Sequence, residues 1–187
     1  MKKLISCFSV ILLILVVAHG CKLFGPSQRD VFEAMQAVMR GFENSMHEDN
    51  MEIKDAYSNA ADAVFRNEDD SVVTSMTAIM NDNQIHVYGK SIFSEYLDPS
   101  TDYQLDGEFN YNIKSIGSYR AGSWFGEMDC SVELTGGKID TLEFSFVLDE
   151  SGEVEEYYIT ANDVDLDLDK QNSVMDILKR FTQQMPG

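Results

Sequence analysis

From residue 103 to residue 113 every second position carries an apolar side chain or a glycine, and this alternation is the strongest constraint on the fold. The positions between are acids and amides. Because side chains of a strand point to opposite faces in turn, the pattern predicts an antiparallel strand with one buried and one solvated face. The same period returns in residues 128–134, 142–148 and 154–161, and more weakly in residues 84–90. The sequence therefore predicts a meander of strands.

Apolar steps of three and four predict helices before and after these strands. Residues 29–47 place their apolar side chains on one helical face. A second helix is expected over residues 51–65, residues 71–80 fit either a helix or a strand, and residues 174–181 indicate a closing helix. We therefore expect an α+β fold, with two or three N-terminal helices packed on a curved antiparallel meander of five or six strands, and with a C-terminal helix.

That order of elements is similar in outline to cone-shaped NTF2-like folds and to the half-barrels of lipoprotein carriers. The similarity concerns architecture alone, because no residue motif of either family occurs in the chain.

The first 20 residues have the composition of a secretory signal. Two lysines precede an apolar run of 15 residues, from Leu4 to Ala18. This run is shorter than the roughly 20 residues that a membrane-spanning helix needs. The small residues Ala18 and Gly20 come just before Cys21, so we expect cleavage between Gly20 and Cys21 and assign residues 1–20 to a signal peptide.

The segment Ala18-His19-Gly20-Cys21 resembles the lipobox of bacterial lipoproteins. It departs from that pattern at Ala18, where Leu is usual, and at His19, where a small residue is usual. The resemblance implies that Cys21 is acylated and becomes the first mature residue. The same three residues also suit the ordinary secretory peptidase, and a plain secreted protein is the alternative.

The lipidated cysteine also sets the expected domain boundaries and location. Residues 21–28 include Gly25, Pro26 and Ser27, a composition typical of a flexible tether. Residues 29–187 are expected to form one domain. The resemblance places that domain outside the cytoplasm in the cell envelope, anchored to a bacterial membrane, which would be the outer membrane in an organism with two.

Acidic residues dominate the charge of the chain. The signal peptide holds two of the 14 basic residues and none of the 32 acidic ones, so the mature chain has a formal charge of −20. Such a surface repels nucleic acid and anionic lipid, and it keeps a protein soluble. If Cys21 is acylated, Cys130 is the single mature thiol and no internal disulfide forms.

Residues 117–126 are the best candidate for a binding loop. They hold Tyr119, Arg120, Trp124 and Phe125 between glycines. Trp, Tyr and Arg are the residue types most enriched where proteins recognise partners. The alternative is a hairpin connection whose aromatic side chains pack against the edge of the sheet.

Asp163, Asp165 and Asp167 are weak candidates for metal ligands. Alternating carboxylates are reminiscent of a calcium loop, but an EF-hand starting at Asp163 needs Gly at position 168 and Glu at position 174, where this chain has Leu and Val. We therefore favour an edge strand that buries Val164, Leu166 and Leu168 while the aspartates face water. The sequence indicates no metal site and no cofactor.

The mature chain carries none of the motifs that define common catalytic sites. We expect a lipid-anchored cell-envelope protein that acts as a binding or assembly module without catalysis. Its expected partners are the membrane, through the N-terminal lipid, and an envelope protein or a hydrophobic small molecule. The alternative function is a carrier of a hydrophobic ligand, such as a lipid, between helices and sheet. A third is a hydrolase that depends on carboxylates.

Overall fold

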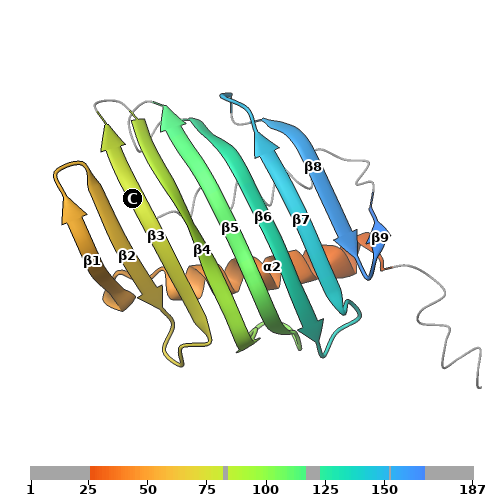
Figure 1. Cartoon of the computed structure of the whole chain (residues 1–187). Coiled ribbons are helices and arrows are strands. Elements are labelled where there is room, and N and C mark those ends of the chain that lie inside the picture. Colours follow the sequence, from red (N-terminus) through yellow and green to blue (C-terminus); the bar gives the residue numbers. More distant parts are fainter. Residues whose placement is uncertain (1–25, 82–83, 117–122, 152, 167–187) are drawn as a thin grey trace, which may run out of the picture.

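The computed structural model describes residues 26–81, 84–116, 123–151 and 153–166. These residues form one antiparallel sheet of nine strands in sequential order, with one α-helix across one of its faces (Figure 1). The strands are β1 (Met51–Tyr57), β2 (Ala60–Arg66), β3 (Val72–Asn81), β4 (Gln84–Leu97), β5 (Gln104–Ile116), β6 (Ser123–Thr135), β7 (Thr141–Leu148), β8 (Val154–Ala161) and β9 (Val164–Asp165). A short 3₁₀ helix, η1 (Glu48–Asn50), connects the α-helix to β1.

The helix α2 (Gln28–Ser45) starts at a complete capping box. Ser27 is the N-cap, and its side chain and that of Asp30 each bond the backbone amide of the other residue. The apolar stripe that predicted this helix is its buried face. Figure 1 shows α2 crossing the sheet from β9 toward β2. No helix in the described ranges is both long and apolar enough to cross a membrane.

The core lies between α2 and the sheet. One row of paired residues crosses seven strands and is buried in each of them: Phe65, Thr74, Ser91, Phe109, Cys130, Phe144 and Ile159. Ring centroids of Phe42 and Phe109 lie 5.6 Å apart in an edge contact. A Cβ on Gly41 would come within 2.6 Å of the Phe93 ring, so this glycine lets α2 approach β4 closely. At these positions the described side chains of α2 and the sheet therefore fill the interface between them.

The expectation of several helices on a small meander is wrong. Residues 51–65, expected to be helical, form the hairpin of β1 and β2, and residues 71–80 lie in β3. Alanines make up four of the apolar positions of the hairpin and fit either period, so their spacing carries little information. In β3 the β-branched residues Val72, Val73 and Thr74 favour the strand.

Nine strands replace the predicted five or six, since the hairpin, β3 and β9 all join the sheet. The predicted C-terminal helix over residues 174–181 lies outside the described residues.

Candidate functional site

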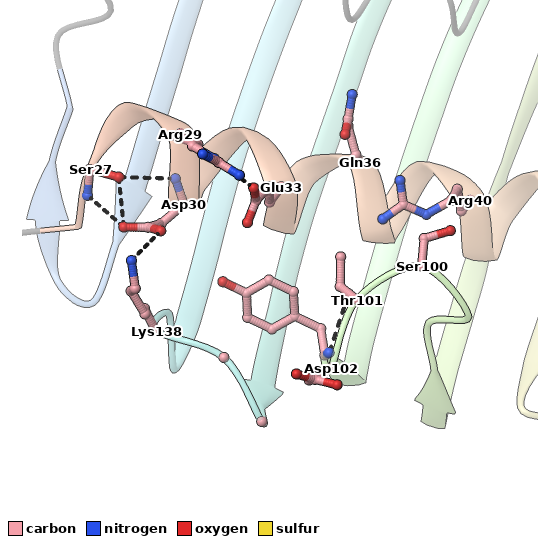
Figure 2. A pocket seen from close by; sticks show the side chains of 13 residues that line it. Ser27, Arg29, Asp30, Glu33, Gln36, Arg40, Ser100, Thr101, Asp102 and Lys138 are labelled. Atoms are coloured by element: carbon pink, nitrogen blue, oxygen red, sulfur yellow. Dashed lines mark hydrogen bonds and ion pairs between the residues drawn. The ribbon is translucent and has the colours of Figure 1, made fainter.

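A cleft of about 710 Å³ opens between α2 and two loops, the β4–β5 loop and the β6–β7 loop (Figure 2). We call it the first cleft. Its lining is mostly polar and consists of Ser27, Arg29, Asp30, Glu33, Gln36, Arg40, Ser100, Thr101, Asp102, Tyr103, Gly136, Gly137 and Lys138. These residues come from three separate stretches of the chain, which the fold brings together.

A buried ion pair holds Arg40, one of the residues that line the first cleft. Arg40 donates from Nε and Nη2 to the two carboxylate oxygens of Asp98, at 2.7 and 2.8 Å. Thr101 donates a further hydrogen bond to Asp98, at 2.6 Å. Burial alone would raise the pKa of Asp98, but the hydrogen bonds from Arg40 and Thr101 outweigh burial and lower it. The pair therefore ties α2 to the β4–β5 loop with the carboxylate ionised.

A second ion pair links the start of α2 to the β6–β7 loop. Lys138 Nζ lies 2.9 Å from Asp30 Oδ1, while Ser27 Oγ donates to Asp30 Oδ2 at 2.6 Å. The hydrogen bonds from Ser27 and then from Lys138 lower the pKa of Asp30. Asp30 thus both caps the N-terminus of α2 and binds Lys138 of the β6–β7 loop.

Tyr103 and Gly137 form the wall between these two pairs. Tyr103 is buried, and a Cβ on Gly137 would overlap its ring. Only glycine at position 137 lets the β6–β7 loop lie flat on the tyrosine. The wall is set by packing and leaves no aromatic face open to a ligand.

The two ion-paired carboxylates at the first cleft are not poised for proton transfer. Asp30 and Asp98 are held ionised by their partners, so neither is poised to donate a proton near neutral pH. Three of the seven basic residues in the described part of the chain line this cleft: Arg29, Arg40 and Lys138. None of these three was singled out from the sequence.

Replacing Asp30 with alanine is expected to cost about 1–2 kcal/mol of unfolding free energy, because it removes half of the capping box. Replacing Lys138 with alanine should cost less, since the Lys138 side chain is 78% exposed and Asp30 keeps its hydrogen bond from Ser27. Urea unfolding of both variants measures the difference. Equal losses would show that the loop contact, and not the cap, is the stabilising role of Asp30.

A second cleft of about 570 Å³ lies at the other end of α2. It brings together two acidic loops of the sequence, through Asp49 of one and Glu68 and Asp69 of the other. Asn44, His47, Asn50 and Asn67 complete its lining. Among the described side chains, no three His, Cys, Asp or Glu residues are placed to hold a metal ion. We draw no cation site from this cleft.

The aromatic residues of the predicted binding loop lie partly in the sheet. Trp124 and Phe125 belong to β6, where they pair with Ser115 and Lys114 of β5. The Phe125 side chain is partly buried against the core. Tyr119 and Arg120 lie outside the described residues, as does Cys21, so the binding loop of these four residues stays a prediction.

The acidic C-terminal stretch forms a tight turn and a short edge strand. Asn162 and Asp163 have φ angles of 52° and 61°, as a two-residue hairpin turn requires. Asp165 accepts a hydrogen bond from Thr160 at 3.1 Å. Leu166 packs on the core as expected, but Val164 remains 43% exposed. Asp167 and Leu168 lie outside the described residues.

The edge strand β1 is exposed along its whole length. All seven of its residues are exposed, including Met51 at 43%, Ile53 at 57% and Tyr57 at 73%. Met51 pairs with Phe65 and so continues the buried row of the sheet beyond the part that is covered. Apolar side chains at an open strand edge are typical of surfaces that pair with another chain.

Comparison of the chain with family models, curated proteins and solved structures finds no match.

Proposed function

We propose that this chain is a non-catalytic binding module of the cell envelope, held on a bacterial membrane by acyl chains on Cys21, that recognises a partner protein along β1. The observation that carries the proposal is the exposure of β1. An extended segment of a partner could hydrogen-bond to the backbone of this edge while its side chains contact Met51, Ile53 and Tyr57.

Two features of β1 favour a selective partner over indiscriminate pairing. A register shift between Ile53 and Asp55 interrupts the ladder, and Lys54 lies within it. Bulges and lysines are devices by which proteins keep edge strands from aggregating. A partner that accommodates both would be preferred over a regular strand.

The filled interface between α2 and the sheet favours this function over a hydrophobic carrier. A carrier needs an apolar cavity of several hundred cubic ångströms between its layers. Here Gly41 packs against Phe93 and Phe42 packs against Phe109, and both clefts described above are open and lined largely by polar residues.

The test places a photo-crosslinking amino acid at Ile53 in the native host, with Glu143 on the solvated face of β7 as the matched control. We expect one discrete adduct from position 53 and none from position 143. A lysine at position 53 should remove binding while changing stability by no more than about 0.5 kcal/mol, because Ile53 is 57% exposed. The absence of an adduct from position 53, or the same adducts from both positions, contradicts the proposal.

The anchor is tested separately by the intact mass of the mature N-terminus from the same host. Acyl chains on Cys21 add a mass that a plain secreted protein lacks. Membrane release of a Cys21→Ser variant provides the control.

A further inference from the structure

The tether is too short to let the first cleft move far from the anchor. Six residue steps separate Cys21 from Ser27, the N-cap of α2, and such a segment spans at most about 20 Å. Ser27, Arg29 and Asp30 line the first cleft. If Cys21 is acylated as proposed, this cleft lies close to the lipid headgroups.

The cations of the first cleft keep donors available to a headgroup. Arg29 contacts Glu33 at 2.9 Å with 86% of its side chain exposed, and Lys138 contacts Asp30 with 78% exposed. A guanidinium has five N–H donors and an ammonium has three, so one carboxylate contact does not exhaust either. Phosphate oxygens are suitable acceptors for these donors.

The two ends of α2 differ in charge. At the far end, the described residues that line the second cleft include three carboxylates and no lysine or arginine. The 18 residues of α2 separate the ends by about 27 Å. With a mature charge of −20, the acidic end and the body are repelled by anionic lipid, whereas the first cleft combines both signs of charge.

We propose that the first cleft docks on zwitterionic phospholipid headgroups of the membrane that holds Cys21. Arg29 and Lys138 bind headgroup phosphates, while Glu33 and Asp102 face headgroup ammonium groups. This inference rests on the proposed lipid anchor and adds the orientation of the protein on its membrane.

Docking in this orientation leaves β1 on the side away from the anchor. In Figure 1 the N-terminal end of α2 lies beside β9, at the opposite edge of the sheet from β1. Seven strand spacings separate β1 from β8, which is roughly 34 Å. A partner of β1 would therefore meet a surface clear of the bilayer.

The test couples the mature chain through Cys21 to a maleimide phospholipid in vesicles of phosphatidylethanolamine and phosphatidylcholine. Cys130 does not compete for the maleimide, because it is buried and burial raises the pKa of its thiol. Hydrogen–deuterium exchange is then compared between coupled and free protein. We expect amide exchange in residues 100–103 and 136–138 to slow about fivefold on vesicles, with no change at the β1–β2 turn.

Charge reversal identifies the side chains responsible. The double variant Arg29→Glu/Lys138→Glu should abolish the slowing; both side chains are exposed, and urea unfolding checks that the fold withstands a carboxylate beside Asp30. The matched control Lys90→Glu/Lys114→Glu makes the same charge change on the opposite face of the sheet and should keep the slowing. No slowing on vesicles, or slowing that survives Arg29→Glu/Lys138→Glu, overturns the docking.

Because Cys21 is coupled chemically, the vesicle experiment does not depend on whether Cys21 is acylated in the native host. An unmodified Cys21 in the native host would refute the proposed function's lipid anchor, whereas the vesicle experiment reports whether the first cleft binds headgroups once it is brought to them.

Discussion

Replacing Asp98 with alanine is expected to lower the free energy of unfolding by about 3 kcal/mol. Asp98 is 1% exposed and accepts three hydrogen bonds, two from Arg40 and one from Thr101. The variant leaves the guanidinium, whose side chain is only 26% exposed, without its carboxylate. The cost is at the low end for a broken buried pair because Arg40 can partly reach water. Urea unfolding at pH 7 measures it.

Two controls separate the ion pair from its surroundings. Arg29→Ala removes an arginine from the exposed pair with Glu33 and should leave stability nearly unchanged. The double variant Asp98→Ala/Arg40→Leu should recover part of the loss, because no charge then stays buried alone. If the double variant loses as much unfolding free energy as Asp98→Ala and Arg40→Leu lose in sum, Asp98 and Arg40 act independently.

The contribution of Asp98 should vanish only in acid. Its pKa is lowered in the folded state, so its stabilisation is complete above the unfolded pKa of about 3.9 and is lost as the pH falls through the folded pKa. Burial raises the pKa of Glu43, whose protonation has the opposite effect on stability. The difference between wild type and Asp98→Ala cancels Glu43 and should stay constant from pH 7 to 5, then shrink below pH about 4.

The sequence predicts α2 and the strictly alternating strands correctly, although the expected fold class is wrong. Residues 103–113 and 142–148 alternate strictly because α2 covers only one face of these strands. The apolar stripe of α2 likewise marks the one face that this helix buries. The hairpin β1–β2 lacks such a signal for a physical reason. The strand β1 has no buried face, so burial imposes no alternation on its sequence. The alanines of the hairpin fit a helix as well as a strand.

The first cleft lies beyond sequence reasoning because its contacts are distant along the chain. Arg40 and Asp98 are separated by 58 positions, and Asp30 and Lys138 by 108. In a chain with 32 acidic residues, a single Asp gives no sign that it is paired. The sequence does carry one local signal: the capping box of Ser27 and Asp30 places the start of α2, and with it the edge of the cleft, close to Cys21.

Replacing Phe109 with alanine is expected to cost about 3–5 kcal/mol, the largest effect of any single change considered. Phe109 is 1% exposed at the middle of β5, and its ring lies 5.6 Å from that of Phe42 and 6.2 Å from that of Phe144. Truncation opens a cavity where α2 meets the sheet, and the rigid strands on both sides limit how far the site can close. Thermal or urea unfolding gives the loss directly.

Phe109→Leu and Ile92→Ala complete this experiment. Leucine fills part of the cavity and should cost less than half as much as alanine, whereas Ile92 is 41% exposed and its truncation should change stability by no more than about 0.5 kcal/mol. A small loss of unfolding free energy for Phe109→Ala would mean that α2 and the sheet rearrange to fill the cavity. An interface that adapts in this way could admit an apolar ligand, and the filled interface would then no longer favour a β1-binding module over a carrier.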